Sequence, residues 1–407
     1  MVVARGEMLM TAEQRSAAVH AGAELVNIVH ETVSGMRKAQ TDRLRRSPLR
    51  FIPGAVSVID LVDRGSTWGE ASFTSTVSVT ANVLSPVLRL MTPEGAAPMD
   101  ASVRGAGVLA AIGAAVGDSL AGDPRTRALV PELDLRYQGE SITAAEFARL
   151  QQEPTETVVV FLHGLGCTEN NWSEEVIAAA ARASIALVRY PTGSSIADNG
   201  EKLAFLLDEV LIELPECRRL ILVGHSMGGL VARRAMEVSA GVADCVSDLV
   251  TLGSPHGGSP IEKGAQAALM TLNFFAATKP LAMLGHRRSA GIKDLRHGAI
   301  RFEDWGGQDP DTVLWDRTTT VPLPDQVTHH AVVASWPQDS SSWKSALVGD
   351  GAVRHGSAKD QDVGHATQDP KRKVTVLESS SHLSLISHPK VAELISEVVD
   401  RRSKDWK

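Results

Sequence analysis

Residues 219–232 read RLILVGHSMGGLVA, an apolar run followed by a glycine-rich turn and a second apolar run at helical spacing. The run 219–223 predicts a strand buried on both faces, and the residues after the turn predict a helix. Ser226 lies at the centre of G-x-S-x-G, the pattern of a nucleophile elbow between a strand and a helix. Because strand and helix approach closely there, its neighbours must be small, and Gly224 and Gly228 meet that need.

Similar apolar runs recur from about residue 130 and alternate with helical stretches. This alternation predicts an α/β fold with a doubly wound, mostly parallel sheet, right-handed crossovers and helices on both faces. The predicted strands are 157–162, 185–189, 219–223, 248–252, 329–335 and 373–377. The predicted helices are 173–182, 200–213, 229–240 and 389–402.

A glycine turn, His163-Gly164-Leu165-Gly166, follows the first predicted strand. A tetrahedral intermediate carries negative charge on the former carbonyl oxygen, and two fixed backbone N–H donors stabilise that charge. We expect the amide of Met227, directly after the predicted nucleophile, to be one donor and the amide of Leu165 to be the other. The alternative is an ordinary glycine turn.

A serine hydroxyl needs a base, and the expected base is a histidine after the last strand. Of the 13 histidines, His382 fits this position best, because it lies between the strand 373–377 and the helix 389–402. The others near predicted active-site or C-terminal loops are interpreted as structural (His388), solvated (His355 and His365) or loop-shaping (His163 and His225).

The acid that orients this base should lie between Ser226 and His382 in the sequence. Asp350 fits, because glycines on both sides predict a tight turn that directs its carboxylate inward. Its predicted role is to fix the histidine tautomer and to stabilise the imidazolium. The other candidates are Asp339, Asp360 and Asp362. A plain surface aspartate is the remaining interpretation of Asp350.

These motifs resemble the α/β-hydrolase superfamily, and within it lipase-like serine esterases similar to GPI inositol deacylase-like hydrolases. The order Ser226, Asp350, His382 is typical of that superfamily. The resemblance covers roughly residues 135–402 and implies a serine ester hydrolase. Arg354 departs from the pattern, since many relatives have proline after the acid turn. The segments that carry the resemblance are His163–Gly166 with Trp172, Thr251–Gly258, Gly349–Val353 and Ser381–Leu385.

A cap is predicted at about residues 256–328, because the roughly seventy residues before the strand 329–335 are too many for a plain loop. The stretches 267–277 and 279–284 are apolar and helix-like. Above a catalytic serine they favour an apolar acyl substrate. The alternative is that they only pack on the core.

Residues 1–130 match no family and are predicted to form a helix-rich region before a catalytic domain at 131–407. An amphipathic helix is expected at 12–46. The basic stretch 37–50 suggests peripheral contact with a membrane surface, and a solvated helix end is the alternative. The small apolar residues 105–117 predict a closely packed helix, with a membrane-inserted element as the alternative.

Composition narrows the function classes. The 407 residues include 41 basic and 48 acidic side chains, a formal net charge of −7, which argues against a nucleic-acid binder. Cys167, Cys217 and Cys245 are widely spaced, so neither a disulfide framework nor a cysteine-based zinc site is indicated. No secretory signal is apparent at the N-terminus. We therefore expect a cytoplasmic protein, with peripheral membrane contact as an extension of that expectation.

The predicted function is hydrolysis of a small-molecule or lipid carboxylic ester through an acyl-enzyme on Ser226, with no metal or organic cofactor. Two alternatives remain. An acyltransferase would use the same three residues with an alcohol in place of water. A non-catalytic, membrane-associated scaffold would explain the long N-terminal region, but the complete set of catalytic residue types favours an enzyme.

Overall fold

The computed structural model describes residues 10–27, 30, 74–75, 77–86, 88–89, 96–151, 155–257, 289–305, 307, 321–335 and 371–401. These residues fall into two compact units. The first takes the described residues up to Met99 together with Ser119–Val130. The second takes Asp100–Asp118 and the described residues from Pro131 onwards.

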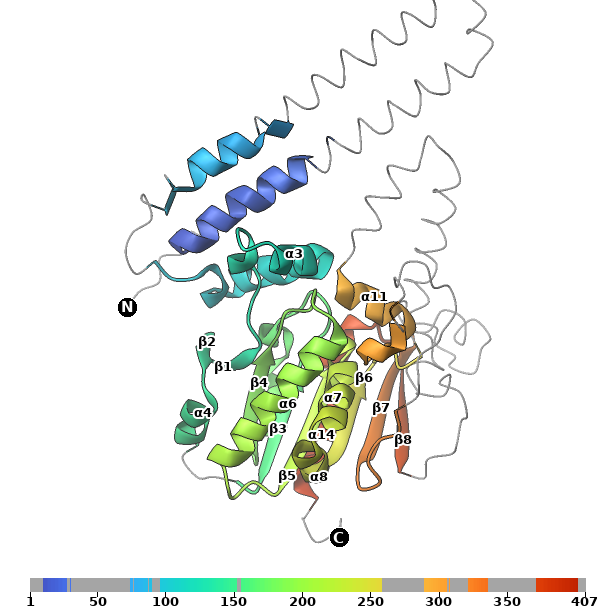
Figure 1. Ribbon diagram of the computed structural model, residues 1–407. Coiled ribbons are helices and arrows are strands. Elements are labelled where there is room, and N and C mark those ends of the chain that lie inside the picture. The colour runs from blue at the N-terminus through green and yellow to red at the C-terminus, as the bar shows by residue number, and fades with distance from the viewer. Residues whose placement is uncertain are drawn as a thin grey trace, which may run out of the picture. The chain divides into compact units, whose positions relative to one another are not determined.

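An eight-stranded sheet forms the centre of the second unit, in the order β2-β1-β4-β3-β5-β6-β7-β8 (Figure 1). The strands β3 to β8 all run parallel to one another, while β1 pairs antiparallel with both β2 and β4. The strands are β1 Asp134–Tyr137, β2 Glu140–Ile142, β3 Thr157–Leu162, β4 Ser184–Arg189, β5 Arg219–His225, β6 Val246–Leu252, β7 Thr328–Ser335 and β8 Arg372–Glu378. The predicted fold class is confirmed, and the predicted strands match β3 to β8.

Helices flank this sheet, and the predicted ones appear as α5, α6, α7 and α14, with α5 shorter than expected. The α-helices are α3 Val103–Gly122, α4 Ala144–Leu150, α5 Glu174–Ala178, α6 Ile196–Glu213, α7 Met227–Val238, α8 Ala240–Cys245, α11 Ala290–His297 and α14 Pro389–Asp400. The short 3₁₀ helices are η2 Met99–Ala101, η3 Arg127–Leu129, η4 Glu169–Asn171, η5 Phe302–Trp305 and η7 Leu383–Ser387.

The two faces of the sheet bury alternate side chains of the same strands. In β3, Val158 and Val160 pack in one apolar cluster with α6 and α7. Val159 and Phe161 pack in a second cluster with α5 and α14. A strand covered on both faces needs apolar residues at nearly every position, which explains why the continuous apolar runs identified the strands.

The first unit is helical over residues 12–27 and 77–86. The hydroxyls of Ser16 and Ser85 are hydrogen-bonded to each other. Asn27 Nδ2, near the other end of its helix, donates to the hydroxyl of Ser78 at 3.5 Å. These two contacts pair the helical segments in opposite directions, and the predicted helix-rich N-terminal region is confirmed. The basic stretch 37–50 lies outside the described residues.

Small residues let α3 approach the loop after β4 closely within the second unit. A Cβ placed on Gly193, in the loop after β4, would lie 2.8 Å from the Cα of Gly117 and would clash with the carbonyl of Gly113. Larger residues at these positions would push α3 away, so the small-residue spacing has the packing role that the sequence predicts. In the part of the chain that the structure describes, no helix has the length and apolar character needed to cross a membrane.

The predicted cap is described at 256–257, 289–305, 307 and 321–328, whereas the apolar stretches 267–277 and 279–284 lie outside the described residues. Within the described part, Asp294 of α11 attaches this helix to the start of α6 and to Trp305. Its Oδ2 accepts a hydrogen bond from the backbone N–H of Ile196, at the start of α6, at 2.8 Å. Its Oδ1 accepts one from Trp305 Nε1, also at 2.8 Å.

Asp294 should make stability depend on pH. Burial, with smaller contributions from Asp304 and Asp198, raises the pKa of this carboxyl from 3.8 to about 7. The native state therefore keeps a proton that the unfolded chain loses above about pH 4. The contribution of Asp294 to the free energy of unfolding is fully present below that pH and is lost as the pH rises through about 7.

Asp294→Asn does not titrate at this position. We therefore expect the free energy of unfolding of the variant, minus that of the wild type, to increase by up to a few kcal/mol when the pH is raised from about 5 to about 8. Urea unfolding of both proteins at the two pH values measures this gain. The same difference between variant and wild type at both pH values would contradict the assignment.

Candidate active site

Ser226 occupies the turn between β5 and α7 with φ 52° and ψ −116°. A side-chain-bearing residue seldom adopts such angles, which cost about 1–3 kcal/mol, so the surrounding structure must hold it there. The backbone N–H of Ser226 donates to the carbonyl of Leu252, at the end of β6, at 2.8 Å. Its side chain is half-buried. The structure therefore places Ser226 in the strained strand–turn–helix that the sequence predicts.

The glycines of this turn are required by the closeness of strand and helix. A Cβ on Gly224 would lie 2.6 Å from the carbonyl carbon of Gly228. A Cβ on Gly228 would lie 2.8 Å from the carbonyl oxygen of His163. These neighbours are backbone atoms, which cannot move aside as a flexible side chain can. Larger residues would therefore separate β5 from α7 and displace Ser226.

His382 reaches the same edge of the sheet from the loop after β8, and it is half-buried. Its ring lies against Gly253, the residue after Leu252, whose carbonyl accepts the Ser226 N–H. A Cβ on Gly253 would lie 2.8 Å from His382 Nδ1 and 2.9 Å from His382 Cε1. His225 Nε2 donates to the carbonyl of His382 at 3.1 Å, and the two ring centroids are 4.9 Å apart. The ends of β5, β6 and β8 thus bring Ser226 and His382 to one corner of the sheet.

Gly253→Ala should disturb this corner. Gly253 has φ +63°, and the new methyl would displace the His382 ring. Because a displacement of about 1 Å in a catalytic group can cost up to 10²-fold in rate, we expect kcat to fall by about 10-fold to 100-fold. Ester turnover and thermal unfolding of the purified variant test this.

Gly139→Ala is the matched control, since Gly139 also has positive φ, at +87°, and lies in the turn between β1 and β2. It should lose a comparable amount of stability while kcat stays near the wild-type value. Equal losses of kcat in the two variants would mean that backbone strain, rather than the position of His382, explains the effect.

The predicted oxyanion loop passes beside Ser226. A Cβ on Gly164 would lie 3.2 Å from Ser226 Cβ and 2.7 Å from His225 Nδ1. Leu165 follows Gly164, and Met227 is the first residue of α7. Within the described ranges, neither the Leu165 N–H nor the Met227 N–H has a hydrogen-bond acceptor. Two such donors next to the nucleophile suit a developing oxyanion, and their role stays a prediction.

His163 attaches the start of this loop to the residue after β4. Its Nε2 accepts a hydrogen bond from the backbone N–H of Tyr190 at 3.3 Å, so Nδ1 carries the proton and donates to the carbonyl of Gly164 at 3.0 Å. The rings of His163 and Tyr190 stack with their centroids 4.3 Å apart. Burial lowers the pKa of His163 to about 4, so the ring is neutral at neutral pH. These contacts agree with a loop-shaping role.

Asp350, the predicted acid, lies outside the described residues, and so do the other candidate acids, Asp339, Asp360 and Asp362. The role of Asp350 therefore stays a prediction. Among the side chains that the structure describes, no group of three or more His, Cys, Asp or Glu is arranged to hold a metal ion.

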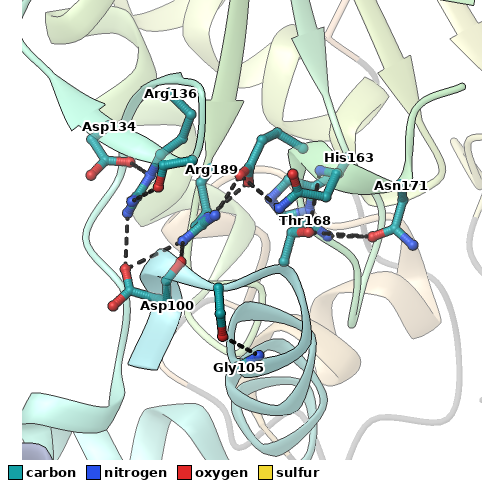
Figure 2. Close-up of polar contacts among 12 residues, drawn as sticks. Asp100, Gly105, Asp134, Arg136, His163, Thr168, Asn171 and Arg189 are labelled. Carbon is teal, nitrogen blue, oxygen red and sulfur yellow. Dashed lines mark hydrogen bonds and ion pairs between the residues drawn. The ribbon is translucent and has the colours of Figure 1, made fainter. Parts of the chain in front are cut away.

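Sequence reasoning did not single out the buried ion pairs around Arg189 (Figure 2). Arg189 ends β4 and pairs with Glu169, which is the last residue of the oxyanion loop when that loop is taken as residues 163–169. A signal was present in the residues IALVR at 185–189, because a charged residue that closes a buried apolar run must find a partner. The identity of that partner is not readable from the strand.

Residues 159–393 match the sequence model of the alpha/beta hydrolase family. This chain belongs to that family. The matched span runs from the third residue of β3 into α14, so it includes the turn that carries Ser226, the oxyanion loop and the loop that carries His382. It does not include α3, which nonetheless packs on the catalytic unit of this hydrolase family member.

Two curated relatives of this hydrolase family member share a short stretch with it. It is 47% identical over 49 residues to a GPI inositol-deacylase of Aspergillus fumigatus and 45% identical over 49 residues to one of Aspergillus oryzae. Each match covers 12% of this chain and 4% of the relative.

Solved lipase structures also align with this hydrolase family member. A mature lipase of Bacillus licheniformis aligns at 20% identity and a TM-score of 0.39, over 61% of this chain and 94% of that one. Lipase B of Aspergillus fumigatus aligns at 10% identity and a TM-score of 0.39, over 61% of this chain and 55% of that one.

Proposed function

We propose that this protein is a serine hydrolase that cleaves a carboxylic ester through an acyl-enzyme on Ser226. The observation that carries the proposal is the strained turn at Ser226, which packs against Gly164 of the oxyanion loop, together with the ring of His382 at Gly253. A nucleophile, a base and backbone N–H donors are the groups that acyl transfer requires.

The reaction begins when Ser226 Oγ attacks the ester carbonyl while His382 accepts its proton. The carbonyl oxygen becomes negatively charged and accepts hydrogen bonds from the N–H groups of Leu165 and Met227. The intermediate then collapses, and His382 returns the proton to the departing alcohol. A water molecule, deprotonated by His382, attacks the acyl-enzyme and releases the carboxylic acid and the free serine.

Asp350 completes the proposed triad by accepting a hydrogen bond from the imidazole of His382, which would fix its tautomer and stabilise the imidazolium. The proposed substrate has an apolar acyl group, on the strength of the apolar stretches predicted in the cap. The short similarity to proteins named GPI inositol-deacylase agrees with cleavage of an acyl group, and we take no more than that from it.

Labelling with a fluorophosphonate tests this proposal, because the reagent forms a stable adduct with an activated serine. We expect one adduct, and peptide mapping should place it on Ser226. Chromogenic esters of graded acyl length should be hydrolysed, with a preference for longer chains. A folded protein that neither takes the label nor cleaves any ester would contradict the proposal, and a product that carries the acyl group on an added alcohol would favour acyl transfer instead.

A further inference from the structure

A buried arginine connects the oxyanion loop to a segment far away in the sequence (Figure 2). Arg189 is 2% exposed and its carboxylate partner, Glu169, is 3% exposed. Arg189 Nε donates to Glu169 Oε2 at 2.7 Å, and Nη2 donates to Oε1. Two parallel hydrogen bonds between planar groups fix their relative orientation as well as their distance.

The other side of the guanidinium binds Asp100, in η2 directly before α3. Arg189 Nη1 donates to the backbone carbonyl of Asp100 at 2.8 Å and to its Oδ2 at 3.3 Å. The same carboxylate accepts a hydrogen bond from Arg136 Nη2 at 3.2 Å, and Arg136 Nε donates to Asp134 at 2.7 Å. Arg189 therefore lies between a carboxylate of the loop and a carboxylate at the start of α3.

Both ends of the oxyanion loop are attached to the same short segment, residues 189–192. Its first end is held there by His163, whose Nε2 accepts the backbone N–H of Tyr190. Its second end is held by Glu169, which binds Arg189. Between them, the N–H of Gly166 donates to Thr192 Oγ1 at 3.2 Å. Leu165 lies within this bracketed loop, so the direction of its N–H depends on those attachments.

The ion pair is better suited to positioning than to stability. Burying two charges carries a desolvation penalty that can exceed their attraction, and apolar residues of similar size would often serve stability equally well. What such a pair provides is a single geometry, because removing Arg189 would leave the buried carboxylate of Glu169 without its cation, and removing Glu169 would leave Arg189 with only Asp100 to orient it. That property matters most in a loop whose backbone donors must be placed accurately.

We propose that Arg189 and Glu169 are positioning residues whose ion pair sets the place of the Leu165 N–H, and that Asp100 links this place to the start of α3. The role of Leu165 rests on the proposed function, whereas the attachment of the loop to Arg189 is independent of it. Asp100 lies before the family match at 159–393, so a segment outside that span contributes to the active site.

Glu169→Gln is the main test, because it keeps the shape of the side chain and removes the charge that binds Arg189. Two measurements are needed. The first is hydrogen–deuterium exchange of the backbone over residues 163–171. The second is the inhibition constant of a trifluoromethyl ketone, whose adduct with serine carries an oxyanion, compared with KM for an ester of the same acyl group. Only the inhibitor depends strongly on the oxyanion donors.

In Glu169→Gln we expect exchange over residues 163–171 to be about 10-fold faster. Since a displaced donor costs less than a missing one, kcat/KM should fall by about 10-fold to 100-fold. The inhibition constant should rise by a similar factor, and KM should change by less than about threefold. Asp100→Asn, a milder change at the more exposed partner, should shift the same quantities in the same direction by smaller factors.

Arg219→Gln is the matched control. Arg219 is also 2% exposed and pairs with a buried carboxylate, Asp248, at 2.8 Å, but it lies at the first residue of β5, away from the loop. It should lose stability while exchange over 163–171 and the ratio of inhibition constant to KM stay as in the wild type. The same changes in this control as in Glu169→Gln would reduce the effect to general destabilisation and overturn the proposal.

Wild-type exchange over residues 163–171 in folded Glu169→Gln would also overturn it. If Glu169→Gln does not fold, Asp100→Asn decides by the same measurement. If the wild type itself shows no esterase activity and no inhibitor binding, the proposed function fails, and the exchange data still support or reject the attachment of the loop to Arg189 on their own.

Discussion

Ser226→Ala should lower kcat for ester hydrolysis by roughly 10⁶-fold, the scale of loss seen when the nucleophile of a catalytic triad is removed. The variant loses the only atom that bonds to the acyl group in the proposed mechanism. Its fold should be retained, because alanine meets the same backbone strain as serine at φ 52°, and Gly224 and Gly228 are unchanged. Turnover of a chromogenic ester and thermal unfolding of the purified variant give the two measurements.

Ser254→Ala provides a control within the same region. Ser254 follows Gly253 at the end of β6, and it is 0% exposed, so its hydroxyl cannot reach a substrate. We expect its kcat to stay within about threefold of the wild-type value, as for a buried hydroxyl without a catalytic role. Turnover near the wild-type level in folded Ser226→Ala would reject the acyl-enzyme mechanism.

His382→Ala should lower kcat by a similar factor, because the hydroxyl of Ser226 is a poor nucleophile without a base. Removing both side chains should cost no more than removing one, since the two groups act as a unit. The kcat values of wild type, both single variants and the double variant form the cycle that tests this. Multiplied losses in the double variant would show that the two residues act independently.

His388→Ala is the control for this cycle. His388 is the N-cap residue of α14, where its ring accepts a hydrogen bond from the backbone N–H of Lys390 at 3.2 Å. We expect a loss of about 1 kcal/mol in stability and an unchanged kcat. Retained activity in His382→Ala together with lost activity in His388→Ala would show that His388, and not His382, is the base.

Asp100 and α3 lie in the part of the chain that the sequence analysis assigns to the N-terminal region. The predicted boundary at residue 130 separates both of them from the hydrolase, yet Asp100–Asp118 form part of the second compact unit. A Cβ on Gly166 of the oxyanion loop would lie 3.6 Å from Ala114 Cβ, in ordinary contact with α3. The catalytic unit of this protein is therefore larger than the family match at 159–393.

Three elements that the apolar patterning did not predict, β1, β2 and α4, have a common cause. β1 and β2 are short strands near one edge of the sheet, and they expose Tyr137 and Glu140, so they lack the continuous apolar runs of the central strands. α4 is a single short helix with a capping box at Thr143, a local signal that is weak without its packing partners. Elements with little buried surface leave little trace in hydrophobic patterning.

The amino-acid sequence by itself determined the parallel sheet and the turn at Ser226, because burial on both faces demands apolar runs and close approach demands glycine, and both demands are local. The tertiary structure alone decided that His225 would hold the His382 loop and that Arg189 would join Glu169 to Asp100. Those contacts link residues from separate elements, and a buried charge or ring nitrogen finds its partner in space rather than at any fixed spacing along the chain.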